Sequence, residues 1–186
     1  MLKFKVKNLH FLYGGKKEIH KNPIKINAIV LSSGTGKTTL ANTFSDNLID
    51  IDSIVHTPTT KKYMKLLRRK ALISYKKGNK NAFDKVNNMN GKLLLDAIKK
   101  KPNLVKKIFL IHTSTMFGNA PLKINVIDSL KSTKNEIIKV ANKRKKIDPL
   151  WGELTIKNWL ELNAKKLNYK SIKKIVSNLI MLNKQN

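Results

Sequence analysis

Short apolar runs alternate along this chain with longer segments in which apolar side chains recur every three or four residues. The first apolar run, Ile24–Leu31, is rich in β-branched residues and predicts a buried strand. Residues 32–36 are small and polar and interrupt this strand, and residues 37–44 carry apolar side chains at helical spacing. The pattern therefore predicts a strand, a glycine-containing loop and an amphipathic helix in direct succession.

The rest of the chain repeats this alternation. Further strands are expected at 47–52, 105–111 and 123–128, and helices at 59–77, 82–100, 133–146, 153–167 and 171–182. Residues 129–132 are interpreted as the start of the helix that follows them. Residues 1–23, with apolar Phe4 and Val6 and a turn expected at Gly14-Gly15, suggest one or two short strands that precede the main domain.

The loop after the first strand has the residues of a nucleotide phosphate loop, because Gly-Lys-Thr stands at the start of the helix. Glycines let the backbone approach a phosphate closely, and successive N–H groups can surround it. We expect the nucleotide phosphates to be bound by Ser33, Gly34, Thr35, Gly36, Lys37, Thr38 and Thr39. Lys37 would bridge the β- and γ-phosphates, and the Thr38 hydroxyl would bind Mg²⁺.

One residue departs from the full pattern, which begins with a glycine where this chain has Leu31. The alternative interpretation is a chance Gly-Thr-Gly-Lys-Thr-Thr in a chain rich in lysine and threonine. The strand before the loop and the helix after it favour the phosphate loop. The predicted fold class is therefore α/β of the P-loop NTPase type, with a mostly parallel sheet, helices on both faces and a short N-terminal β arm. A fifth parallel strand is not evident, and residues 24–186 are taken as one domain after the arm, 1–23.

Two carboxylates, Asp50 and Asp52, end the second predicted strand, where parallel sheets place their ligands. Asp50 would support Mg²⁺ and Asp52 would take a proton from the acceptor or hold the acceptor in line; the two roles could also be exchanged. The alternative is that these residues only cap a helix beginning near Ser53. Asp128, at the end of another predicted strand, competes with Asp50 for the metal. His112, at the end of the strand 105–111, is interpreted as structural rather than as a base.

The chain carries a large excess of positive charge. It has 39 Lys and Arg against 11 Asp and Glu, a formal net charge of +28. Such a surface attracts polyanions, so nucleic acid is an expected partner beside ATP, although codon bias in an AT-rich viral, phage, endosymbiont or parasite genome would also raise the lysine content. No apolar run approaches a membrane span, no signal peptide is evident, and there is no cysteine. We expect a cytoplasmic protein without a membrane partner.

Basic residues gather in two segments. Residues 61–77 form a run that either steers an anionic substrate or is simply the solvated side of a helix, and arginine, rare in this chain, appears there as Arg68 and Arg69. Residues 143–146, Lys-Arg-Lys-Lys, end a predicted helix. One interpretation is that these cations only suit the negative end of the helix dipole. The other is that they belong to a lid at about 143–155, on which Trp151 could lie. Such a lid covers the triphosphate and neutralises charge in the transition state.

The order of these motifs resembles the small P-loop kinases of the shikimate kinase, gluconate kinase and nucleotide kinase group. LSSGTGKTTLA is similar to their phosphate loop except at Leu31, and LIDIDSIV is similar to their second strand. IFLIHTSTMFG falls where shikimate kinases carry a strand and a glycine-rich turn, and two of the glycines of that turn are absent here. The resemblance implies that Arg144 lies near the adenine or the phosphates as a catalytic residue beside Lys37 and Asp52. Polynucleotide 5′-kinases share this layout.

The predicted function is therefore transfer of the γ-phosphoryl group of ATP, with Mg²⁺, to a nucleotide, a polynucleotide end or a small hydroxyl acceptor. A second hypothesis is a basic nucleic-acid-binding structural or replication protein that retains a P-loop for NTP. A motor-type ATPase is a third hypothesis, disfavoured by the chain length and by the lack of an arginine-finger region.

Overall fold

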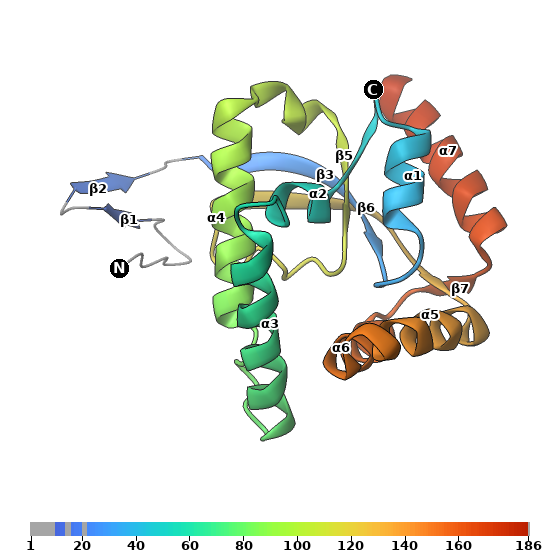
Figure 1. Ribbon diagram of the computed structural model, residues 1–186. Helices are drawn as coiled ribbons and strands as arrows, with labels where there is room; N and C mark the ends of the chain where they lie inside the picture. Colours follow the sequence, from blue (N-terminus) through green and yellow to red (C-terminus); the bar gives the residue numbers. More distant parts are fainter. Residues whose placement is uncertain (1–9, 14–15, 20–21, 186) are drawn as a thin grey trace. The chain divides into compact units, whose positions relative to one another are not determined.

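The computed structural model of the chain is an α/β structure and describes residues 10–13, 16–19 and 22–185 (Figure 1). Contacts divide the chain into two compact units. Unit 1 contains described residues of 1–26, 52–105 and 115–125, and unit 2 contains 27–51, 106–114 and 126–186. None of the helices in this described part of the chain is long and apolar enough to cross a membrane.

A five-stranded parallel sheet has the order β4-β5-β3-β6-β7, so the strand that precedes the glycine-containing loop is central. Its strands are β3 (Ile24–Leu31), β4 (Leu48–Asp50), β5 (Ile108–Ile111), β6 (Leu122–Ser132) and β7 (Lys165–Leu167). Phe109 of β5 is opposite Ala28 of β3 and Ile49 of β4, and Leu130 of β6 is opposite Lys165 of β7. The chain continues from β3 to β4 on one side of the sheet and from β6 to β7 on the other. The switch point therefore lies between β3 and β6, and α/β sheets bind ligands at such points.

The core of unit 2 lies between one face of this sheet and two helices. Alternate residues of a strand share one face, so Ile29 and Leu31 of β3 pack on the same side as Ile108 and Leu110 of β5. Helices α1 (Lys37–Thr43) and α7 (Tyr169–Gln185) cover this side and lie next to each other in Figure 1. The helical residues of this core are Leu40, Ala41, Ile172, Val176 and Ile180.

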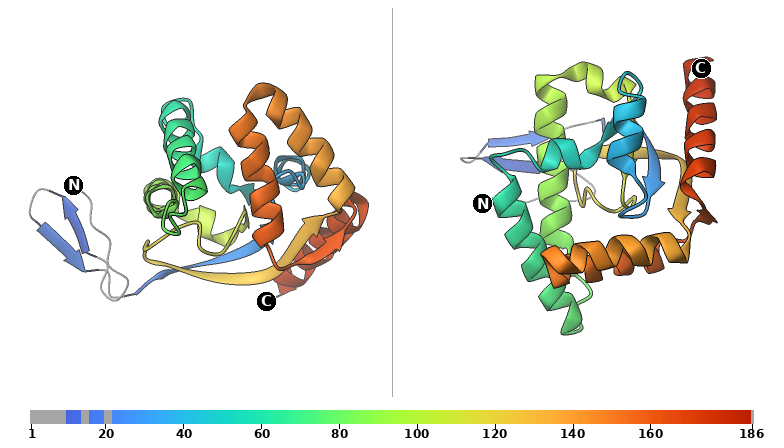
Figure 2. Two further views of the ribbon diagram at one scale, coloured as in Figure 1. Left: turned by 90° about the horizontal axis from the view of Figure 1, so that it is seen from below. Right: turned by 45° about the vertical axis from the view of Figure 1, so that its right-hand side comes forward.

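Helices α5 (Lys134–Ile147) and α6 (Pro149–Glu161) form a hairpin within unit 2 (Figure 2). The turn between them follows from two residues. Asp148 accepts a hydrogen bond from the Leu150 N–H at 3.0 Å and so caps α6, and Pro149 occupies its first position, where no N–H is needed. The segment 143–155, which the sequence suggests as a lid, is therefore the end of one regular helix and the beginning of the next.

The far end of α6 is attached to the last residues of β6. The Trp159 indole N–H donates to the Ser132 carbonyl at 2.8 Å, and the Lys131 Nζ donates to the carbonyls of Trp159 and Leu162 at 3.2 and 2.5 Å. Carbonyls at a helix C-terminus carry partial negative charge and suit a cation. Burial, followed by the charge of Lys166, lowers the pKa of Lys131.

Unit 1 is built mainly from α2 (Ile51–Val55), α3 (Lys61–Lys76) and α4 (Asp84–Lys100), with a 3₁₀ turn at Pro102–Lys106. Met64, Leu67 and Ala71 of α3 pack on Val86 of α4 at helical spacing. Gly91 of α4 has a separate reason to be glycine, because a Cβ there would overlap the carbonyl of Phe117. The N-terminal strands β1 (His10–Tyr13) and β2 (Lys16–Ile19) pair antiparallel, whereas Phe4, Val6 and the Gly14-Gly15 turn lie outside the described residues.

Several element predictions were wrong in detail. The fifth parallel strand exists as β7, and residues 162–167, expected to be helical, leave the helix after Glu161. Residues 129–132 continue β6 instead of starting a helix. The strand β4 ends at Asp50, so Asp52 lies in the first turn of α2 and not at a strand end.

Glu136 joins the start of α5 to the start of α7. Its carboxylate accepts hydrogen bonds from the Thr133 N–H and hydroxyl at 3.0 and 2.8 Å and from the Tyr169 N–H at 3.4 Å, and Thr133 in turn caps the helix. Burial alone would raise the pKa of Glu136, but these hydrogen bonds and the charge of Lys139 outweigh it and lower the pKa.

We expect Glu136→Gln to lower the free energy of unfolding by about 1 kcal/mol at pH 7, because the charged acceptor of three donors is lost. A depressed carboxyl pKa stabilises the fold above the ordinary value of 4.5, and this contribution is lost as the pH falls through the lower, folded-state pKa. The difference between wild type and variant in urea unfolding should therefore shrink below pH 4.5. Glu161→Gln, which removes a surface pair with Lys157, is the control; equal losses in both variants would contradict the prediction.

Candidate functional site

The glycine loop, residues 32–36, joins β3 to α1 and is held by its own hydroxyl groups. The Thr35 hydroxyl donates to the Ser32 carbonyl at 2.7 Å and lies 2.6 Å from the Ser32 hydroxyl oxygen. Gly34 and Gly36 have φ angles of 87° and 86°, in the left-handed region that favours glycine. The loop thus turns its backbone in a way that a chain of ordinary residues would resist.

Lys37 follows the loop and turns its ammonium back into it. Only 5% of the residue is exposed, and Nζ donates to the carbonyls of Leu31 and Ser32 at 3.3 and 3.4 Å. Nζ also lies 2.9 Å from Nδ1 of His112, which follows β5. An ammonium has three hydrogens to donate, and these contacts direct it toward the inside of the loop.

Thr38 and Asp50 meet beside the loop. The Thr38 hydroxyl donates to Oδ2 of Asp50 at 2.7 Å, and Asp50, at the end of β4, is 4% exposed. A hydroxyl and a carboxylate are hard oxygen ligands of the kind that Mg²⁺ accepts, usually with few protein ligands and the rest from phosphate and water. Residues 10–13, 16–19 and 22–185 contain no group of three or more His, Asp or Glu that could hold a metal.

Arg144 reaches the glycine loop from α5. Its Nη1 donates to the Ser33 hydroxyl at 2.6 Å and to the Thr155 hydroxyl of α6 at 2.7 Å. Its guanidinium also lies over the Trp151 ring, with Cζ 4.8 Å from the ring centroid. The resemblance to small kinases implies that this arginine lies near the adenine or the phosphates, which stays a prediction; the structure shows its contact with Ser33 of the loop.

Side chains from two neighbouring helices pack against the glycine loop. A Cβ on Gly34 would be 2.8 Å from Cγ1 of Val140 in α5, and a Cβ on Gly36 would be 2.7 Å from the ring of Tyr169 at the start of α7. Both glycines are therefore needed for close approach as well as for their φ angles. Helices α5 and α7 hold the loop on two sides, and the capping box of Glu136 ties these helices together.

Asp52 and Arg68 belong to unit 1 and form an ion pair there. Oδ1 of Asp52 is 3.5 Å from Nη2 of Arg68 and 3.6 Å from Nε2 of His56, and 36% of the Asp52 side chain is exposed. Such half-exposed pairs contribute little to stability. The role of Asp52 in proton transfer, and the choice between steering and a solvated helix side for the basic run that contains Arg68, stay predictions.

Two further residues that the sequence predicts for the site are Thr39 and Asp128. Thr39 is exposed, and its carbonyl accepts a hydrogen bond from the Thr43 hydroxyl at 2.9 Å. Asp128 is not at the end of a strand, since β6 continues to Ser132; its carboxylate accepts from the Ser129 N–H at 2.7 Å. Sequence reasoning missed Thr155 and Tyr169, and it left His112 as a structural residue although a polar residue at a strand end was a usable signal.

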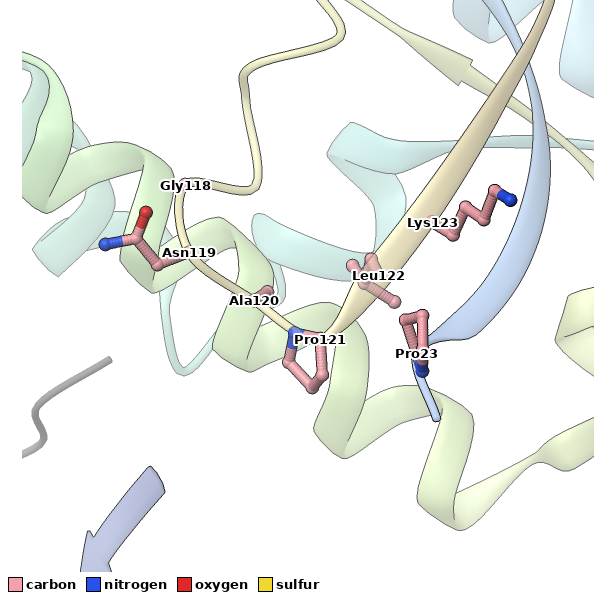
Figure 3. Close-up of a pocket in the computed structure, with 7 residues that line it drawn as sticks. All are labelled: Pro23, Gly118, Asn119, Ala120, Pro121, Leu122 and Lys123. Atoms are coloured by element: carbon pink, nitrogen blue, oxygen red, sulfur yellow. The ribbon is translucent and has the colours of Figure 1, made fainter. Parts of the chain in front are cut away.

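A hollow in unit 1 is separate from these residues. It is lined by Pro23 and residues 118–123 (Figure 3). Its wall is fixed by a hydrogen bond from the Ile24 N–H to the Pro121 carbonyl at 2.9 Å. Among the described residues that line it, Lys123 is the one with an ionisable side chain, and none belongs to the glycine loop.

No protein-family model matches this chain, and no curated protein matches its sequence. The resemblance to the small P-loop kinases therefore stays a prediction.

Close packing at Gly34 can be tested against Gly78, which has the same φ of 87° but nothing within 4 Å of a Cβ. Gly78→Ala should lower the free energy of unfolding by about 1 to 2 kcal/mol, the cost of a side chain in the left-handed region. Gly34→Ala should lose roughly 1 to 3 kcal/mol more, because Val140 must also move. Urea unfolding of both variants measures the difference; similar losses would show that α5 does not press on the loop.

Proposed function

We propose that the protein is an ATP- and Mg²⁺-dependent phosphotransferase of the P-loop kinase type. The observation that carries this proposal is the position of the Lys37 ammonium, which is turned into a loop with two positive-φ glycines. A buried ammonium needs polar partners, and those of Lys37 include two carbonyls at the start of the loop, which phosphate oxygens could replace. Arg144, on the Ser33 hydroxyl of the same loop, is a second cation for the same anion.

The residues of the loop would each have a separate task. Backbone N–H groups of residues 33–38 and the Lys37 Nζ bind the β- and γ-phosphates, and Lys37 exchanges its carbonyl partners for phosphate oxygens. Thr38 and Asp50, which already share a hydrogen bond, would hold Mg²⁺, which offsets phosphate charge during transfer. Arg144 orients the γ-phosphoryl group and offsets its developing charge.

The reaction transfers the γ-phosphoryl group to an acceptor oxygen. A bond forms between the acceptor oxygen and the γ-phosphorus, the bond from that phosphorus to the β,γ-bridging oxygen breaks, and ADP leaves. The acceptor proton goes to a base, for which Asp52 is the sequence candidate. We favour a nucleotide or a polynucleotide end as acceptor, because the net charge of +28 attracts polyanions.

We expect the wild-type protein, given ATP labelled at the γ-phosphate and Mg²⁺, to transfer label to one acceptor class. The panel contains 5′-hydroxyl DNA and RNA oligomers, nucleoside monophosphates and small polyols. Lys37→Ala should reduce the rate by about a hundredfold or more, since it removes a charge that interacts with the transition state. Lys25→Ala, at an exposed lysine of β3, is the matched control and should retain the wild-type rate. Label found only as free phosphate, or a Lys37→Ala rate equal to wild type, would contradict the kinase assignment.

A second candidate function, nucleic-acid binding, is favoured by helix α3. This helix of 16 residues contains no acidic residue, and its exposed side carries Lys62, Arg69 and Lys76. Tyr63 and Tyr75 are 47% and 37% exposed on the same helix. Cations for the backbone and aromatic rings for the bases are what single-stranded nucleic acid requires of a protein surface.

We expect the double variant Lys62→Glu/Arg69→Glu to bind a labelled single-stranded oligonucleotide more weakly than wild type. The slope of log affinity against log salt should fall by about 0.7 for each lost phosphate contact. Lys173→Glu/Lys174→Glu on α7 makes the same change in net charge at exposed positions and is the control. Fluorescence anisotropy at several salt concentrations measures both. Equal weakening in the two double variants would assign the binding to net charge and not to α3.

A further inference from the structure

Trp151 is a large aromatic residue that stays open to solvent. It is 44% exposed on the first turns of α6, whereas Trp159 on the same helix is 6% exposed and its indole N–H is bonded to Ser132. An indole that is open to solvent beside a candidate site offers a ligand a flat, rigid aromatic surface.

The indole is joined to the glycine loop through a single side chain. Arg144 lies over the Trp151 ring at 4.8 Å and donates to the Ser33 hydroxyl at 2.6 Å, so one guanidinium contacts both. The guanidinium of Arg144 therefore links the Trp151 ring to the loop that would bind phosphate. A ligand with phosphate in the loop could reach the ring with an attached aromatic group.

The position of Trp151 is fixed by the start of α6. Asp148 caps the helix, and the Thr155 hydroxyl donates to the Trp151 carbonyl at 2.9 Å. Gly152, the next residue, lies so close to Ala141 and Lys145 of α5 that a Cβ there would overlap them. The indole is thus carried on a rigid helix pressed against α5, which is what a stacking surface needs.

We propose that Trp151 is a platform on which a nucleobase stacks, and that Arg144 joins this platform to the phosphate site. The proposal rests on the proposed function, because it places the phosphates of the same reaction in the glycine loop. Nucleotides combine an aromatic ring with phosphate in one molecule, and the pair of an indole and a guanidinium matches both parts. The base belongs either to ATP or to a nucleotide acceptor, and the experiment separates these two sources.

The test uses the full chain as wild type, Trp151→Leu, Trp151→Phe and Lys37→Ala. Leu160→Ala is the control, because Leu160 is a 65% exposed apolar residue of the same helix. Three probes are titrated with Mg²⁺ and followed by calorimetry: a non-hydrolysable ATP analogue, a short 5′-hydroxyl oligothymidylate and inorganic tripolyphosphate, which has no base. The emission of buried Trp159 reports in the Trp151 variants that the fold is intact.

Trp151→Leu should weaken binding of a base-carrying probe about five- to one-hundredfold, the usual range for a lost stacking contact. Trp151→Phe should retain most of the affinity, Leu160→Ala all of it, and tripolyphosphate should bind Trp151→Leu as it binds wild type. A loss with the ATP analogue assigns the base to the donor, and a loss with the oligothymidylate assigns it to the acceptor. Wild-type affinity of Trp151→Leu for both base-carrying probes overturns the proposal.

Two further readouts keep the stacking proposal and the phosphate site distinguishable. Base-carrying probes should quench the tryptophan emission of the unmutated protein more than tripolyphosphate does, and equal effects of all three probes overturn stacking even if a variant fails to fold. Tripolyphosphate binding that survives in Lys37→Ala overturns the phosphate site instead, whatever Trp151→Leu does.

Discussion

The approach of α5 to the glycine loop is the contact on which the rest of unit 2 depends. Val140 reaches the loop because Gly34 has no side chain, and one helical turn later Arg144 reaches Ser33. The capping box of Glu136 fixes where α5 begins and ties it to α7. A bulkier loop would displace α5, and the cation that α5 carries would move with it. Protein interiors are close-packed, so a displacement of this kind is passed on to neighbouring elements.

The strongest sequence signals gave the central part of the fold correctly. β3 spans Ile24–Leu31 and α1 begins at Lys37, as the apolar run and the glycine loop predict, and the sheet is parallel. The signal failed where an element is short or carries lysines. β7 has three residues, two of them exposed lysines, so it shows no period of two. The end of β6 was missed because a lysine, Lys131, is unexpected in a buried strand. Its ammonium is accommodated by carbonyls at the end of α6, which only the folded chain brings near.

The candidate site was predictable to the extent that its residues are neighbours in sequence. Residues 33–38 form one motif, and Asp50 follows at the next strand end, where Thr38 meets it. Thr155 and Tyr169 carry no comparable signal, because each is an ordinary residue of an amphipathic helix until tertiary packing brings it to the loop. Asp52 was assigned to a strand end because Leu48–Asp50 is too short to show where the strand stops.

The attachment of α6 has a consequence for how a ligand would enter. Thr155 bonds to Arg144, the Trp159 indole bonds to Ser132, and Lys131 bonds to the last carbonyls of the helix, so α6 is held at its middle and at its end. A flap that orders only around its ligand loses backbone entropy of about 1 to 2 kcal/mol for each residue at that moment. Here that entropy has already been lost in folding, so the affinity of a ligand for this side of the loop would not be reduced by it.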